Sequence, residues 1–137
     1  MNRDEIKTFL PHREPMLLLD EVSLDENGQA QGRYFVRGDE WFLQGHFPQN
    51  PIVPGVVLCE IVAQTAGILI RDQLAGKTPL YAGMDKVRFR HMVRPGDTIT
   101  IHCRILREKM NVYIIAGEAF VADKPCVSGE FMLMLAG

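Results

Sequence analysis

A single acidic side chain interrupts the most apolar stretch of the chain. Glu60 lies within residues 56–70, where nearly every neighbour is apolar. Burial of an unpaired charge is costly, so Glu60 is expected to have a partner or to be held neutral. On a helix, Gln64 lies one turn further along and Gly67 follows at i+7, which makes a narrow polar strip. Glu60 could form a structural hydrogen bond there, or act as a general acid.

A histidine lies in a loop that prolines should stiffen. His46 belongs to the segment Gly45-His46-Phe47-Pro48, and Pro51 and Pro54 follow closely. This composition predicts an irregular loop over residues 41–54 that excludes helix and central strand. A loop histidine can be exposed and idle. Held still, it would suit a catalytic base, because histidine exchanges protons near neutral pH.

The residues Pro54-Gly55-Val56 predict the start of a helix. Proline fits the first helical position, and the first amides of a helix have no partner within it. Glycine lets a substrate oxygen approach the backbone, so Gly55 and Val56 could hold a carbonyl oxygen that gains negative charge. An ordinary helix start is the alternative interpretation.

Three basic residues alternate with apolar ones between positions 86 and 90. In a strand this pattern places Lys86, Arg88 and Arg90 on one face. A solvated surface explains such a stripe, and so does a docking surface for an acidic partner or a phosphate-bearing tail.

Other kinds of site are not indicated. His12, His91 and His102 lack the spacing of metal ligands. We find no phosphate-binding loop, dinucleotide fingerprint or serine nucleophile elbow. Cys59 is next to Glu60 but falls on a different face of the helix, so we interpret it as core packing.

The elements that must position these residues form an α+β pattern. A helix is predicted from Pro54 through Leu74, with Gly76 as its stop, and it is apolar on nearly every side, so protein should surround it. Short helical turns are expected over residues 4–9. The predicted strands cover residues 16–22, 29–36, 98–105, 111–121 and 126–135, with a hairpin turn at 25–28. The simplest packing is an antiparallel sheet wrapped around the helix, whose edges a dimer could cover.

Length, composition and net charge narrow the possible classes of protein further. The 137 residues suit one domain, and 47% hydrophobic with 23% charged residues indicate a globular fold. A net charge of −2 argues against nucleic-acid binding. Three widely spaced cysteines and no signal peptide favour a cytoplasmic location. The apolar segment 56–70 is too short to cross a membrane.

The chain resembles the 3-hydroxyacyl-[acyl-carrier-protein] dehydratases of the FabZ type. The central motif runs from Gly45-His46-Phe47-Pro48 through Pro51, Pro54-Gly55-Val56-Val57 and Glu60 to Gln64. Flanking similarity covers Leu10-Pro11-His12-Arg13 with Asp20, residues 82–90, and Val93-Arg94-Pro95-Gly96-Asp97. Together these segments cover most of the chain.

The resemblance implies a hot-dog fold and a homodimer in which each site joins the histidine of one subunit to the glutamate of the other. Dimers of this family often form a hexamer as a trimer of dimers. His46 would remove the C2 proton and Glu60 would protonate the departing 3-hydroxyl. The Gly55 amide would hold the thioester oxygen, and Gln64 would orient Glu60 or the released water. The expected substrate-binding residues are Gly55, Val56, Gln64, Gly67 and Phe47.

The resemblance implies no metal or redox cofactor, since the substrate arrives on the phosphopantetheine of acyl carrier protein. This acidic partner would explain the basic stripe. Related dehydratase–isomerases usually have aspartate at the acid position, so Glu60 favours plain dehydration and leaves isomerase activity open. Many members have an aromatic gate residue where this chain has Leu80, beside Tyr81, so the preferred acyl length stays open.

Two alternatives remain. A hot-dog acyl thioesterase could use Glu60 to activate water, but the Gly-His-Phe-Pro loop has no clear part in that reaction. A non-catalytic acyl-carrier-binding module would need a tunnel for the acyl chain and the basic stripe of Lys86, Arg88 and Arg90, but neither His46 nor Glu60.

Overall fold

Six antiparallel strands and one buried helix make up most of the structure, a computed structural model that describes residues 1–137. The strands are β1 (Glu21–Leu24), β2 (Ala30–Phe35), β3 (Thr78–Phe89), β4 (Thr98–Lys109), β5 (Val112–Val121) and β6 (Lys124–Ala136). The helices are α1 (Arg3–Ile6), α2 (Gly55–Ala66) and α3 (Arg71–Leu74), with 3₁₀ turns at Trp41–Leu43 and Gly67–Ile70.

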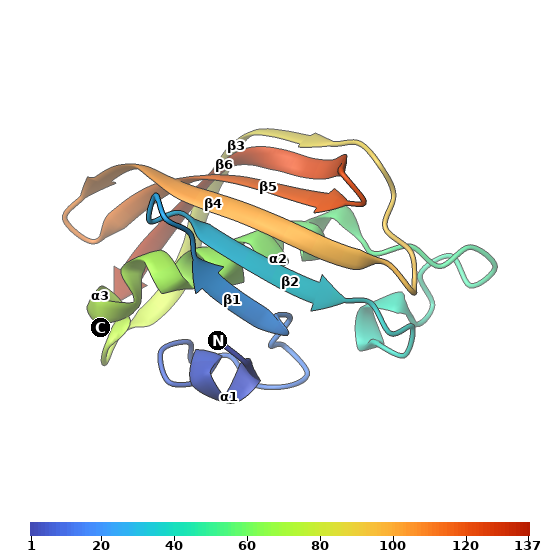
Figure 1. The fold of residues 1–137 in the computed structure, drawn as a ribbon, viewed down its shortest axis with the longest axis horizontal. Helices are drawn as coiled ribbons and strands as arrows, with labels where there is room; N and C mark the ends of the chain where they lie inside the picture. Colours follow the sequence, from blue (N-terminus) through green and yellow to red (C-terminus); the bar gives the residue numbers. More distant parts are fainter.

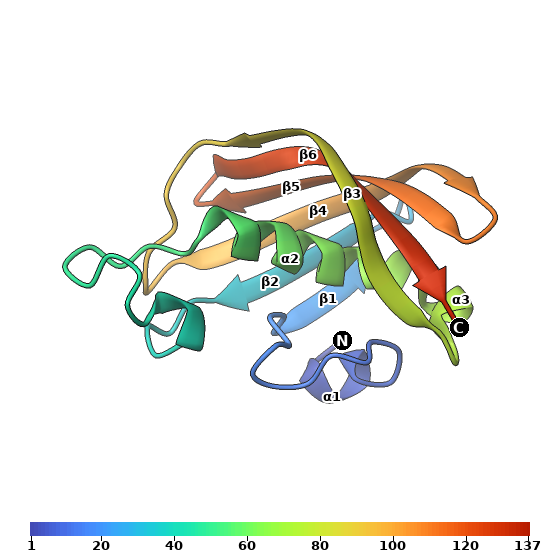
Figure 2. The same ribbon diagram turned by 180° about the vertical axis from the view of Figure 1, so that it is seen from behind.

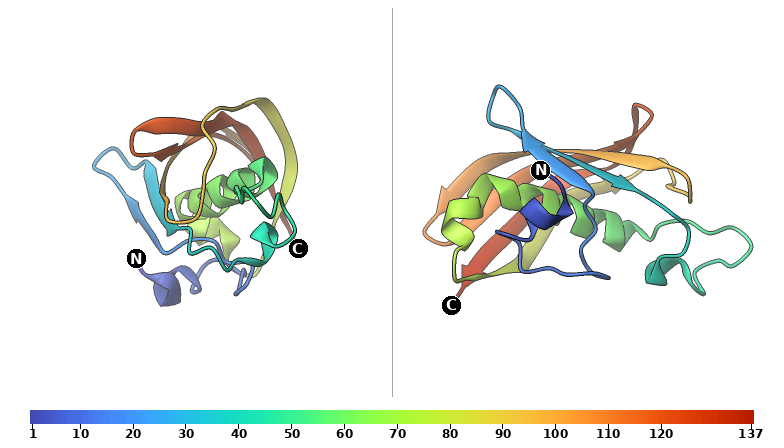
Figure 3. Two further views of the ribbon diagram at one scale, coloured as in Figure 1. Left: turned by 90° about the vertical axis from the view of Figure 1, so that its right-hand side faces the viewer. Right: turned by 60° about the horizontal axis from the view of Figure 1, so that its bottom comes forward.

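The strands form one sheet in the order β1-β2-β4-β5-β6-β3, and α2 lies against its concave face (Figures 1 and 2). Seen nearly along α2, the sheet curls around the helix (Figure 3, left). The close approach of α2 to the sheet depends on Gly117 of β5, because a side chain there would collide with Val62 of α2. Gly117 pairs with Gly129 of β6. The predicted α+β hot-dog fold is confirmed.

The helical region ends where the sequence predicts, but it is not one α-helix. α2 ends at Ala66, and the chain continues to Leu74 as a 3₁₀ turn and then α3. Gly67 begins the turn, and a Cβ there would lie 2.7 Å from the Leu10 side chain. Gly76 then adopts φ +72°, which confirms it as the stop.

The prediction that protein surrounds α2 on every side is only partly correct within one chain. Val57, Leu58, Ile61 and Val62 are buried, but Val56 is 70% exposed. Glu60 and Ala63, at helical spacing from Val56, are also only partly buried. One face of this apolar helix therefore lacks a cover.

The predicted strand at residues 16–22 is wrong over most of its length. β1 begins only at Glu21. Before it, the Leu18 amide and the Met16 carbonyl bond to the Gln64 side chain, and pairing with β2 starts at the Asp20 amide, which donates to the Arg33 carbonyl at 2.8 Å. The hairpin prediction is confirmed. Asp25 accepts the amides of Asn27 and Gln29, each at 2.9 Å, and Gly28 has φ +74°.

All three cysteines are free and buried, and burial raises the pKa of each thiol. The position of Cys59 in the core confirms that it packs there. No helix of the structure combines the length and the apolar character that crossing a bilayer requires.

Candidate active site

Glu60 is held by a side chain whose own orientation is fixed. Gln64 is 1% exposed, and its Nε2 donates to Glu60 Oε2 at 2.9 Å and to the Met16 carbonyl at 2.7 Å. Its Oε1 accepts the Leu18 amide at 2.8 Å. The backbone amide of Leu18 can only donate, so the Gln64 amide cannot be flipped. Glu60 therefore has the expected partner, and Gln64 orients it.

The structure adds a residue that the sequence analysis set aside. His12 Nε2 lies 3.3 Å from Glu60 Oε2. Histidine spacing argues against a metal site at His12, and nothing in residue spacing indicates a contact between positions 12 and 60. Its place within the Leu-Pro-His-Arg segment of the FabZ resemblance was the one available signal.

His46 is oriented by one hydrogen-bonding contact and by ring packing. Its Nδ1 lies 3.0 Å from the Ile52 carbonyl oxygen. A carbonyl only accepts, so Nδ1 carries the proton and Nε2 is left as an acceptor, the form that a general base requires. The Phe47 ring packs on the imidazole with centroids 4.3 Å apart, while Phe47 itself is 57% exposed.

The loop that carries His46 extends beyond the sheet (Figure 1) and is anchored at its first residues. Glu40 accepts the Tyr34 hydroxyl at 2.6 Å and the amides of Arg37 and Gly38 at 2.9 and 2.8 Å. Burial alone would raise the pKa of Glu40, but these donors outweigh it and hold the pKa below its usual value. The loop is mostly irregular as predicted, although it contains the short 3₁₀ turn.

The start of α2 presents free amides. Neither the Gly55 nor the Val56 amide donates a hydrogen bond within the chain. The Phe89 ring covers Gly55 so closely that a Cβ there would lie 2.7 Å from it. Glycine at position 55 is thus required for packing against Phe89.

The proposed acid and base line separate hollows of one chain. His46 and Phe47 line a hollow of about 460 Å³ together with Gly55, Val56 and Phe89. Glu60 lines a smaller pocket of about 50 Å³ with Gln64, Gly67, His12, Leu80 and Tyr81. Within one chain, His46 and Glu60 therefore do not line a common hollow.

The regular alternation expected for Lys86, Arg88 and Arg90 is wrong. A bulge interrupts β3 between Asp85 and Arg88, and Lys86 adopts φ 55°. β3 ends at Phe89, so Arg90 lies beyond it, in the hollow that His46 lines. The Lys86 ammonium lies 3.5 Å from Glu130, which partly neutralises it.

Of the two gate candidates, Tyr81 is fixed in place. Its hydroxyl donates to the Cys59 carbonyl of α2, its ring packs near Phe131, and burial raises its pKa. Leu80 is 43% exposed and has no such anchor. No three His, Cys, Asp or Glu side chains gather as a metal site would require.

Comparison with known proteins places this geometry in context. Residues 10–130 match the model of the FabA-like domain family. The chain is 41% identical over 140 residues to 3-hydroxyacyl-[acyl-carrier-protein] dehydratase FabZ of Clostridium beijerinckii, covering 98% of this chain and 99% of that protein. It is 42% identical over 134 residues to the FabZ protein of Petrotoga mobilis, covering 97% and 96%.

Two solved structures share the fold. The dehydratase heterocomplex ApeI:P from Xenorhabdus doucetiae superposes with a TM-score of 0.82 at 20% identity, over 96% of this chain and 91% of that one. A hypothetical thioesterase from Streptococcus pneumoniae, solved with coenzyme A, gives 0.64 at 12% identity over 85% of each chain.

Proposed function

Because this chain belongs to the FabA-like domain family, we propose that it is a 3-hydroxyacyl-[acyl-carrier-protein] dehydratase of fatty acid elongation. It eliminates water from the carrier-bound (3R)-hydroxyacyl thioester and forms the trans-2-enoyl thioester. The observation that carries the proposal is the fixed tautomer of His46, whose Nε2 is free to accept a proton, combined with a carboxyl group, Glu60, oriented on a buried helix.

His46 Nε2 removes the C2 proton of the substrate, and the electron pair forms the C2–C3 double bond. Protonated Glu60 donates its proton to the 3-hydroxyl group, which leaves as water when the C3–O bond breaks. The free Gly55 and Val56 amides stabilise the thioester oxygen as negative charge develops on it. An acid, a base and these amides suffice for the reaction, so we propose that no cofactor takes part.

We propose that the protein is a homodimer in which each active site combines His46 of one subunit with Glu60 of the other. β3 is an edge of the sheet, and it exposes Leu80, Met84 and Phe89. Phe89 and Val56, which is on the uncovered face of α2, line the same hollow, and a second copy would bury these exposed apolar side chains. Such dimers would gather further into a hexamer, a trimer of dimers.

Mixing inactive subunits tests the shared site. A dimer of one His46→Ala chain and one Glu60→Gln chain has one site with both native residues and one with neither. Co-expressed with different tags and purified on both, such mixed dimers should regain about half of native activity. Activity that stays at the level of the separate variants would place both residues in one chain's site.

We propose that the basic surface near the His46 hollow docks the acidic acyl carrier protein. Arg88 and Arg90 are exposed, and Arg90 lines the hollow itself. Reversing both charges, Arg88→Glu with Arg90→Glu, should raise KM for carrier-bound substrate about tenfold and leave KM for a small-thiol analogue unchanged. Reversal of Arg104 and Lys109, both exposed on β4 and free of ion pairs, is the control. Equal effects on both substrates would contradict a docking role.

The direct test of the function is the absorbance of the conjugated enoyl thioester when purified protein meets crotonyl-acyl carrier protein. We expect the band to fall by hydration without release of free thiol, and Glu60→Gln to abolish the change. Released thiol would indicate a thioesterase instead, and no change in either signal would indicate a binding module.

We further propose that residues 1–137 act as one domain in the cytoplasm. A single cluster of 34 buried residues draws on both ends of the chain, from Ile6 to Leu135. The three reduced cysteines fit a reducing compartment.

A further inference from the structure

We propose that His12 is a positioning residue that acts with Gln64 on one oxygen of Glu60, so that the acid proton resides on the other. The inference rests on the proposed role of Glu60 as the acid. It concerns which oxygen donates, a question on which reaction geometry depends.

Both contacts converge on Oε2. Gln64 Nε2 donates to it at 2.9 Å, and His12 Nε2 lies 3.3 Å away, within reach of donating once the ring reorients slightly. Glu60 Oε1 accepts no hydrogen bond within the chain. A carboxyl proton on Oε2 would oppose these N–H groups, so the protonated acid carries its hydrogen on Oε1.

The surroundings of His12 determine its tautomer. Its Nδ1 is buried and has no hydrogen-bond partner. A buried N–H without an acceptor is rarely found in proteins, whereas an unfilled acceptor is tolerated more often. Nδ1 is therefore the bare nitrogen, and Nε2, which lies 3.3 Å from Glu60 Oε2, carries the hydrogen.

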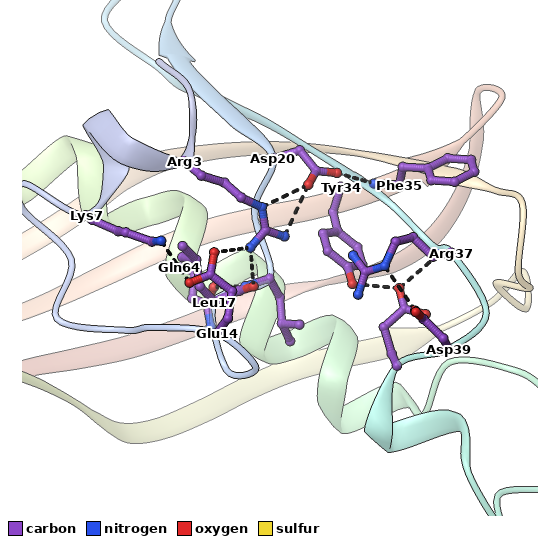
Figure 4. A network of polar contacts seen from close by, with 12 residues as sticks. Arg3, Lys7, Glu14, Leu17, Asp20, Tyr34, Phe35, Arg37, Asp39 and Gln64 are labelled. Carbon is purple, nitrogen blue, oxygen red and sulfur yellow. Dashed lines mark hydrogen bonds and ion pairs between the residues drawn. The ribbon is translucent and has the colours of Figure 1, made fainter.

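The segment that carries His12, residues 10–20, is held firmly enough to position a ring. Arg13 donates to the carbonyls of Leu10 at 2.9 Å and His12 at 2.7 Å. Arg3 contacts Glu14 at 3.1 Å and Asp20 at 3.2 Å and donates to the Leu17 carbonyl at 3.2 Å (Figure 4).

The same segment also fixes Gln64 through the Met16 carbonyl and the Leu18 amide. Both groups that act on Glu60 Oε2 thus depend on one anchored stretch of chain. Because one segment supports both groups, the positions of Gln64 and His12 relative to Glu60 Oε2 are fixed together.

Two substitutions separate positioning from packing. His12→Phe keeps a ring but removes the donor, and it should lower kcat about tenfold to hundredfold with KM changed less than about twofold. In His12→Gln the new amide can reach Oε2, so kcat should stay within about threefold of native. Should His12→Phe fail to fold, His12→Asn replaces it, because its shorter amide cannot reach Oε2.

The decisive measurement combines His12→Phe with Glu60→Gln. Since His12 acts through Glu60, the double variant should retain the residual kcat of Glu60→Gln alone. Full activity of His12→Phe, equal losses in the Phe and Gln variants, or a further full loss on top of Glu60→Gln would overturn the role of His12. If Glu60→Gln itself keeps native activity, the proposed function fails instead.

Discussion

Glu60→Gln is expected to fold normally and to lose about 10²- to 10⁴-fold in kcat, the usual contribution of a general acid. Glutamine is nearly isosteric with glutamate, and its carbonyl can still accept the Gln64 Nε2–H that now reaches Oε2 at 2.9 Å. What the substitution removes is the transferable proton. Steady-state hydration of crotonyl-acyl carrier protein measures the loss, and urea unfolding checks that stability changes by less than about 1 kcal/mol.

The matched control for this variant is Glu118→Gln. Glu118 is an exposed glutamate on β5 that forms no ion pair, so the same chemical change there should leave kcat unaltered. Native turnover by Glu60→Gln would remove Glu60 from the reaction and favour a purely structural role in the Gln64 network.

His46→Ala should reduce kcat by a similar factor of about 10²–10⁴, because no other group takes the C2 proton. The side chain makes one hydrogen bond, to the Ile52 carbonyl, so the expected loss of stability is only about 0.5–1.5 kcal/mol. The two effects are separated by measuring turnover and thermal unfolding on the same preparation.

His102→Ala serves as the control for this prediction. His102 lies on β4 beside the Phe120 ring, away from the His46 hollow, and its removal should leave turnover unchanged. If His46→Ala turned over as fast as the native protein, the base would have to be sought elsewhere.

Much of the fold could be predicted from the sequence because its elements rest on local chemistry, whereas the pairing of His46 with Glu60 rests on the family resemblance and stays a prediction. Proline at position 54 sets the start of α2, and the alternation at residues 98–105 matches β4. The hairpin before β2 follows from the turn residues at 25–28 alone. Such features depend on neighbours within a few positions.

The parts that could not be predicted depend on residues far apart in the chain. His12 reaches Glu60 because the segment before β1 contacts Gln64 of α2 instead of pairing in the sheet, and no periodicity encodes that path. The bulge at Lys86 breaks the expected face, and Gly129 on the neighbouring strand lies so close to Val87 there that a Cβ would be 2.9 Å from it. The 70% exposure of Val56 on an otherwise buried apolar helix is likewise not indicated by the local sequence.

The burial of Cys59, Cys103 and Cys126 has a practical consequence for every assay proposed above. Thiolate is the form that attacks maleimides and aromatic disulfides, and burial with a raised pKa keeps these sulfurs from forming it. The native enzyme should therefore add no background to a colorimetric thiol measurement. Cysteine labelling during such an assay would instead report unfolded molecules. The extent of labelling therefore measures the unfolded fraction of each variant in the same experiment.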